Sequence, residues 1–296
     1  MQLFWRRLRQ DKVALTALGF IVVLILVAVL APVITKIVGV PGPNVQDSNA
    51  LDQFGTPTGP SSAHPFGVDT LGRDIFARVL YGARVSLEIA IIATALSVTI
   101  GVVVGMTAGF FRGWVDTVLS RLIDILLAFP ILLLALGIAA ACSLGKGCLG
   151  GLIKPGLTVV IAVIAFVNWT YIGRIVRGQV LSLREKEFIE ASRSLGAPNR
   201  RIIFKEILPN LFAPIIVLAT LVIPQNILFE AALSFLGVGV QPPKASWGKM
   251  IADATSIFDS AWWYMVFPGA ALLLTVLAFN LLGDGLQDAL NPRRGR

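Results

Sequence analysis

Residues 87–111 read LEIAIIATALSVTIGVVVGMTAGFF, with a single charged residue, Glu88, near the start. About 20 consecutive apolar residues are enough for a helix to cross the hydrocarbon core of a bilayer. The segment also lacks the alternating polarity of a membrane β-strand, and backbone amides in hydrocarbon must pair within their own segment. The sequence therefore predicts a membrane-spanning helix here.

The rest of the chain has the same apolar character. It is 56% hydrophobic and 14% charged, with a mean hydropathy of +0.80, whereas roughly 25% of the residues in a soluble domain are charged. Five more apolar runs occupy 13–35, 119–142, 156–175, 211–236 and 262–282. The first run is too long for the apolar core of a signal peptide, so we expect a retained anchor. The predicted fold class is an all-α membrane protein with six transmembrane helices.

The basic residues indicate how the spans are oriented. Lys and Arg collect in cytoplasmic loops, and 17 of the 25 lie in four segments that six spans would place on one side. These segments are 1–12, 112–121, 174–205 and 293–296. We therefore expect the amino and carboxyl ends in the cytoplasm. This orientation accounts for the formal net charge of +8 better than nucleic-acid binding does.

Two segments are then expected on the outer side. The loop 36–86 should be irregular at first and then form an amphipathic helix, capped by Asp69 or Thr70, at the membrane interface. The second outer segment is 237–263, and its tryptophans favour the headgroup level. They are Trp247, Trp262 and Trp263.

Few side chains are suited to catalysis. The only histidine, His64, lies in the outer loop, which excludes a Ser–His dyad or an H-E-x-x-H zinc site within the spans. The sequence contains no G-x-x-x-x-G-K-[ST] phosphate loop either. Energy for uphill transport would then come from an ion gradient or from a separate nucleotide-binding protein. We predict no catalytic residue and no metal site.

Two carboxylates fall inside predicted spans, where an ionisable group is costly. Asp124 lies near the start of its span, and we expect it to pair with Arg121. Glu230 lies deeper, one turn after Gln225 and Asn226. These three polar residues are expected to face either a cavity on a translocation path or a neighbouring helix. A proton relay is the less favoured role for Glu230.

The two cysteines, Cys142 and Cys148, flank a short loop rich in glycine and lysine. Their spacing permits a disulfide, which an oxidising compartment would favour. The same spacing also fits two reduced thiols near a helix end. The sequence leaves both states open.

The charged segment between the fourth and fifth spans, 176–210, is predicted to be a helix, a break and a second helix. Strong helix formers occupy 187–195, and Gly196 suits the position just after a helix end. Pro198 prevents continuation of the first helix. The second helix should begin at Pro198 or Asn199 and lead into the fifth span. From composition alone, this loop is also consistent with an ordinary charged connector.

A pattern in this loop resembles a known family. Glu190-Ala-Ser-x-x-x-Gly196, followed by Ile207-x-Pro209, is similar to the E-A-A-x-x-x-G…I-x-L-P loop of ABC importer permeases, with Ser192 in place of the second alanine. Five other segments look like the binding-protein-dependent peptide/nickel transport subfamily of these permeases. They are 66–74, 81–87, 234–239, 247–248 and 280–285.

This resemblance implies a type I ABC importer permease in a bacterial inner membrane, with 87–296 as its core and no catalytic activity of its own. The loop would be a coupling helix received by an ATPase. The implied coupling residues are Glu187, Phe188, Glu190, Ala191, Ser192, Leu195, Gly196, Ala197 and Pro209. The implied partners are a second related permease, two cytoplasmic ATPase subunits that bind ATP and Mg, and an extracytoplasmic solute-binding protein.

The implied cargo is a peptide or a related solute: a dipeptide, an oligopeptide, glutathione or nickel. The competing class is an ion-driven secondary transporter, which predicts inverted repeats and a buried coupling carboxylate. No internal repeat is visible, and Glu230 is the only candidate carboxylate. An intramembrane enzyme is disfavoured because the spans contain no histidine.

Overall fold

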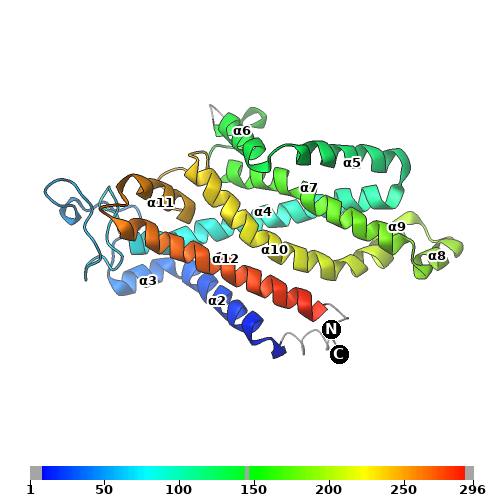
Figure 1. Ribbon diagram of the computed structural model, residues 1–296, viewed down its shortest axis with the longest axis horizontal. Coiled ribbons are helices and arrows are strands. Elements are labelled where there is room, and N and C mark those ends of the chain that lie inside the picture. The colour runs from blue at the N-terminus through cyan, green and yellow to red at the C-terminus, as the bar shows by residue number, and fades with distance from the viewer. Residues whose placement is uncertain (1–8, 144–146, 291–296) are drawn as a thin grey trace.

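The computed structural model describes residues 9–143 and 147–290, and within these residues it is helical without any β-strand (Figure 1). The helices are α2 (Lys12–Val29), α3 (Ala31–Val38), α4 (Ile75–Phe111), α5 (Gly113–Ala128), α6 (Ile131–Ser143), α7 (Leu157–Arg184), α8 (Glu187–Ser194), α9 (Asn199–Arg201), α10 (Leu208–Phe235), α11 (Trp247–Ala254) and α12 (Trp262–Leu290). A π-helical stretch, Ile202–Ile207, joins α9 to α10. The described chain thus forms the all-α fold expected.

Five helical segments are long and apolar enough to span a membrane: α2, α4, α7, α12 and the continuous segment from α9 through α10. Within the described residues the candidate spans number six when the bent pair α5 and α6, whose axes meet at 88°, is counted as one. Phe129 ends α5 in an extended conformation, as the residue before a proline prefers, and α6 starts after Pro130. The run 119–142, predicted as one span, is thus divided between two helices, because Pro130 breaks the helix.

The most extensive helix pair is α4 with α7, and glycines allow their close approach. Gly101, Gly105 and Gly109 lie four residues apart on α4 and face α7. A Cβ on Gly105 would lie 2.5 Å from the carbonyl oxygen of Gly173, which is closer than real contacts allow. Small residues at this spacing are typical of tightly packed membrane helices.

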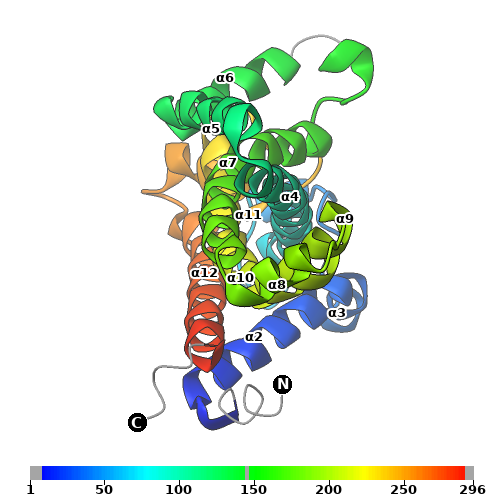
Figure 2. The same cartoon turned by 90° about the vertical axis from the view of Figure 1, so that its right-hand side faces the viewer.

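The two ends of the described chain lie close together. On the other side of α4, the first and last spans pack against each other, with Ala14 of α2 directly against Gly285 of α12. Figure 1 shows α2 and α12 together along the lower edge of the molecule, and Figure 2 shows the two helices meeting near the two termini. The loop before α4 lies at the left end of the elongated molecule in Figure 1, and α8 lies at the right end.

The outer segments differ from expectation. No separate interfacial helix begins at Asp69 or Thr70: one continuous helix, α4, starts at Ile75, and its N-cap Asp74 accepts a hydrogen bond from the Ala77 amide at 2.7 Å. The sequence periodicity did not reveal this continuity, because the amphipathic stretch and the apolar span differ in character but belong to one helix of 37 residues. The structure instead places 69–73 in a turn that folds back on itself.

The tryptophan expectation is wrong for two of the three residues. Trp247 is fully buried, and its indole N–H donates to the Val79 carbonyl at 3.1 Å. Trp263 is 9% exposed and donates to the Val68 carbonyl at 3.3 Å. Only Trp262 is half exposed. Buried indoles need a hydrogen-bond acceptor, and here the backbone of the loop and of α4 supplies it.

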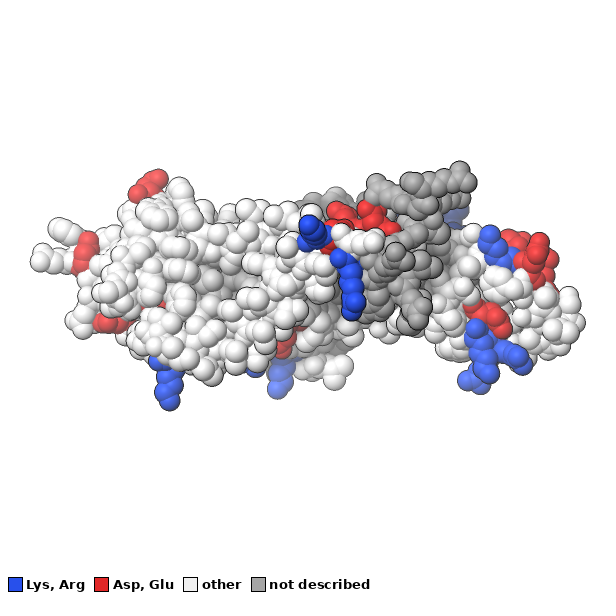
Figure 3. All heavy atoms as spheres, turned by 90° about the horizontal axis from the view of Figure 1, so that it is seen from below, with Lys and Arg blue, Asp and Glu red and all other residues white. Residues whose placement is uncertain are grey.

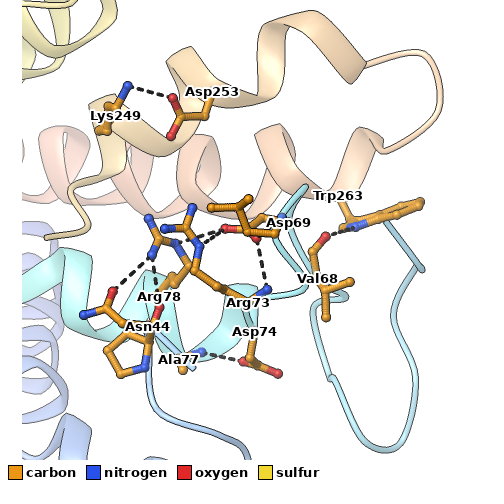
Figure 4. A network of polar contacts seen from close by, with 12 residues as sticks. Asn44, Val68, Asp69, Arg73, Asp74, Ala77, Arg78, Lys249, Asp253 and Trp263 are labelled. Carbon is orange, nitrogen blue, oxygen red and sulfur yellow. Dashed lines mark hydrogen bonds and ion pairs between the residues drawn. The ribbon is translucent and has the colours of Figure 1, made fainter. Parts of the chain in front are cut away.

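A buried polar network fastens the loop to α4 (Figure 4). The Asp69 carboxylate accepts from Arg73 Nε at 2.7 Å and lies 3.5 Å from Arg78 Nε. Arg78 also donates to the Pro43 carbonyl at 3.0 Å. His64, expected to be an ordinary loop residue, is buried with Nδ1 2.8 Å from Asp74 Oδ2. A chain segment that looked irregular is thus held by ionic and hydrogen-bonded contacts.

Candidate functional site

The loop after α7 forms a short helix with a well-defined stop. The helix α8 carries acidic Glu187 and Glu190 in its first turn, where the helix dipole favours them. Leu195 is its C-cap, and Gly196 follows with a positive φ of 74°, a conformation glycine adopts without strain. The Gly196 amide donates to the Arg193 carbonyl and the Ala197 amide to the Ser192 carbonyl, the two bonds of a Schellman motif.

The apolar residues of α8 point in opposite directions. Ile189 is fully buried among Phe110, Val180 and neighbours from 202–211. Phe188 is 41% exposed and Leu195 is 88% exposed. Ile189 therefore fixes α8 to its own chain and is not available to an external partner. Phe188 and Leu195 are left as an apolar surface, and charged side chains gather at the same end of the molecule (Figure 3).

The chain resumes as a helix where it was predicted to. Pro198 is the N-cap of α9, and Asn199 is its first residue. Helix α10 then begins at Leu208, so Pro209 lies in its first turn and has no N–H to donate. A wider turn precedes it: the Leu208 amide donates to the Ile203 carbonyl, five residues back. Pro209 therefore lies on the continuous helix after the loop.

Three arginines connect this loop to the end of α4, and no motif in the sequence singled them out. Arg184 donates to the carbonyls of Gly109 and Phe110, which are free because α4 ends there. The Arg193 guanidinium of α8 lies 5.8 Å from the centre of the Phe110 ring. Arg112 pairs with Glu185.

The three polar residues of α10 do not share one environment. Gln225 is exposed and lines a hollow of about 340 Å³ together with Asn168 and Tyr171 of α7. Asn226 is buried, accepts from the Asn168 amide and donates to Thr94 Oγ1 of α4 at 2.8 Å. Only Gln225 therefore faces open space.

Glu230 is fully buried at a junction of helices. Its carboxylate accepts from Ser86 Oγ of α4 at 3.2 Å and from Ser234 Oγ at 2.7 Å. Ser86 Oγ in turn accepts from the Trp247 amide at 3.3 Å. Of the two environments expected for Glu230, the structure shows the helix contact.

Asp124 has a different partner from the one expected. Asp124 pairs with Arg174 of α7, so the expected partner, Arg121, is wrong. The fold brings the partner from another helix, which local spacing could not reveal.

Cys142 and Cys148 form a disulfide in the structure, with Cα atoms 4.7 Å apart. In the part of the chain that the structure describes, no three His, Cys, Asp or Glu side chains converge as metal ligands.

Comparisons with known proteins agree with this architecture. Residues 101–296 match the model of the binding-protein-dependent transport system inner membrane component family. Residues 1–53 match the model of the N-terminal TM domain of oligopeptide transport permease C.

Curated relatives match nearly the whole chain. The dipeptide transport system permease protein DppC of Alkalihalophilus pseudofirmus is 43% identical, over 98% of this chain and 88% of the relative. DppC of Bacillus subtilis is 40% identical, over 99% of this chain and 85% of the relative. The glutathione transport system permease protein GsiD of Escherichia coli is 41% identical, over 98% of this chain and 89% of the relative.

Solved structures share the fold. The inward-facing MetNI methionine ABC transporter matches with a TM-score of 0.60 and 19% identity, over 72% of this chain and 97% of the matched chain. An amino acid ABC transporter matches with a TM-score of 0.53 and 17% identity, over 71% of this chain and 92% of the matched chain. The family model, the relatives and the helical architecture lead to one conclusion: the chain belongs to the family of binding-protein-dependent transport system inner membrane components, the multi-pass permeases of bacterial ABC importers.

Proposed function

We propose that this chain is the non-catalytic permease subunit of an importer for small peptides, and that α8 receives force from a separate ATPase. The observation that carries the proposal is how α8 is attached to the helix bundle. Ile189 and the Arg193–Phe110 contact hold the helix to the bundle, while Phe188 and Leu195 face outward. A rigidly held helix with an exposed apolar face can transmit movement from a partner that grips it.

The proposed partners follow the family. A second related permease would complete the path, two ATPase subunits would bind ATP and Mg, and an extracytoplasmic protein would deliver the solute. The chain would have both ends in the cytoplasm, because the basic residues lie mostly at the end with α8 and at the two termini. The coupling surface would comprise the exposed residues of 187–197, with Pro209 starting the span that follows.

Peptides are the proposed cargo because relatives across most of the chain are named for dipeptide or glutathione transport. Within this chain, Gln225 would line the path. Asn226 and Glu230 would support it from behind by joining α10 to α4 and α7. Identifying the ligand of a binding protein encoded next to this chain, by mass spectrometry after gentle denaturation, would distinguish dipeptide, oligopeptide, glutathione and nickel.

Co-purification tests the coupling role. Tagged protein should recover an ATPase, and Glu190→Arg should weaken that recovery because it reverses a charge on the exposed side of α8. Gly196→Pro should abolish it by destroying the helix stop. Asp259→Arg, an exposed charge reversal far from α8, is the matched control and should leave recovery unchanged. Recovery of no ATPase by wild-type protein, or full transport by both loop variants, would refute the proposal.

A further inference from the structure

Two hollows lie next to each other along α7 and α10. The first, of about 340 Å³, includes Asn168, Tyr171 and Gln225. The second, of about 630 Å³, includes Tyr171, Gln179 and Gln287, the last from α12. Tyr171 lines both, so the two hollows follow one another along the surface. Tyr171, Ile175 and Gln179 are spaced four residues apart and share one face of α7.

The polar side chains in these hollows are uncharged. Four are amides, one is a phenol, and no Asp, Glu, Lys or Arg of the described chain lines either hollow. Gln179, Gln225 and Gln287 are exposed, and their side chains make no hydrogen bond within the described residues. Unlike Asn226, which is occupied by Asn168 and Thr94, these three amides are available to a ligand.

We propose that this line of amides binds the main chain of a peptide in transit, so that the permease recognises backbone amides and is indifferent to side-chain charge. The inference rests on the proposed import of peptides and specifies how they are bound. A carboxamide offers both a donor and an acceptor, which complement the C=O and N–H of a peptide unit. The surrounding lining is apolar, with Leu127, Ile131 and Phe229 in the first hollow.

Uncharged side chains also suit a transport path, because the bound peptide must be released from it. A fixed charge in a low-dielectric site attracts one sign of side chain and repels the other by a large factor. A neutral hydrogen bond contributes less and holds peptides of different sequence about equally. The amide line therefore predicts similar transport of peptides that differ only in the charge of a central residue.

Removing an amide is the first test. The assembled importer in proteoliposomes is supplied with saturating binding protein that carries one tripeptide, Ala-Ala-Ala. Gln179→Leu and Gln225→Leu should each lower the transport rate about threefold to tenfold, the effect of losing a net hydrogen bond. Gln225→Asn should retain most of the rate because it keeps the amide. Thr99→Val removes a polar group from the exposed face of α4, outside both hollows, and should have no effect.

Adding a charge is the second test. Wild-type importer should move Ala-Lys-Ala and Ala-Asp-Ala at rates within about twofold of each other when each is preloaded on the binding protein. Gln225→Glu should change that ratio by about tenfold in favour of the lysine peptide, because an unpaired carboxylate would face the cargo.

The outcomes distinguish a failure of the amide line as a binding surface from a failure of the proposed import of peptides. If wild-type importer moves peptides but the leucine variants match wild type, or if it already discriminates tenfold between the charged peptides, the amide line is not the binding surface. A Cys introduced at Gln179 that cross-links fully to the second permease in every state would overturn the inference in the same way. If wild-type importer assembles with its ATPase and moves no peptide of any sequence, the proposed function fails as well.

Discussion

Glu230 shows how a buried carboxylate in a membrane helix can be structural. An ionisable group in a span is by default a functional candidate, and a proton-coupled carrier would need one that reaches the transport path. Here the carboxylate is enclosed by Ser86, Ser234 and the start of α11, and it is the exposed Gln225 that reaches open space. The carboxylate thus holds together α4, α10 and α11.

Substitutions at Glu230 should therefore affect stability more than energy coupling. Glu230→Gln keeps one acceptor oxygen and should lower the free energy of unfolding by less than about 1 kcal/mol, with transport retained. Glu230→Leu leaves two buried hydroxyls without their acceptor and should cost about 1–3 kcal/mol. Thermal unfolding in detergent and uptake in cells measure the two effects. If Glu230→Gln folds normally and abolishes transport, the residue has a role in coupling instead.

The limits of sequence reasoning are clearest at this scale. Gly196 and Asn199 could be assigned correctly because helix stops and starts depend on neighbouring residues. Asp124 was assigned to Arg121, whereas its partner Arg174 comes from a different helix. His64, Trp247 and their acceptors likewise meet only through tertiary packing. Local signals therefore predicted the shape of the loop, and contacts between distant segments required the structure.

Among the helices, α4 and α7 form the most extensive close contact. The three glycines of α4 bring the backbones together, and buried Val176 and Val180 fill the remaining space. The bent pair α5 and α6 contrasts with it, since Ile123 is the only fully buried residue of α5. The starts of α7 and α12 agree with the predicted apolar runs, but both helices continue past the predicted ends, to Arg184 and Leu290. Agreement was also poor where Pro130 or the join of loop to span intervened.

A methyl group added at this contact should be costly. In Gly105→Ala the new Cβ would lie 2.5 Å from the Gly173 carbonyl oxygen, so the helices must separate. The expected loss of unfolding free energy is about 1–3 kcal/mol, as for other overpacked sites. Gly19→Ala is the matched control, because its Cβ meets nothing within 4 Å and alanine favours helix. Equal melting temperatures for the two variants in detergent would contradict this account of the packing.

The contact between α8 and α4 offers a route for force into the bundle, in addition to the direct chain connections of the loop to α7 and α10. Arg193→Ala and Phe110→Leu both remove the cation–π contact. If this contact carries movement, the peptide transported per ATP hydrolysed should fall about twofold to fivefold, equivalent to ~0.5–1 kcal/mol. Arg200→Ala, an exposed arginine of α9, is the control and should not change the ratio. An unchanged ratio in both test variants, with normal ATPase binding, would exclude this route.

The dimensions of the whole molecule determine which parts lie outside the bilayer. At about 1.5 Å per residue, the 37 residues of α4 extend roughly 55 Å, well beyond the ~30 Å hydrocarbon core. Its first turns carry Arg78, which joins the network of Asp69 and Arg73 in the preceding loop. Its other end contacts Arg184 and Arg193 near α8. The loop network and α8 therefore belong on opposite sides of the membrane.

Labelling of single cysteines tests this arrangement. In a background with Cys142 and Cys148 replaced by serine, Gln53→Cys in the exposed outer loop should react with a membrane-impermeant maleimide in intact spheroplasts. Leu195→Cys, at the 88% exposed tip of α8, should react only after the membrane is opened. The positive-inside rule gives the direction, since 17 of the 25 Lys and Arg lie in the two termini and in the segments 112–121 and 174–205 next to α8. The reverse labelling pattern would invert the topology and place α8 out of reach of a cytoplasmic ATPase, while labelling of both positions in sealed cells would show that the loop and α8 share one side.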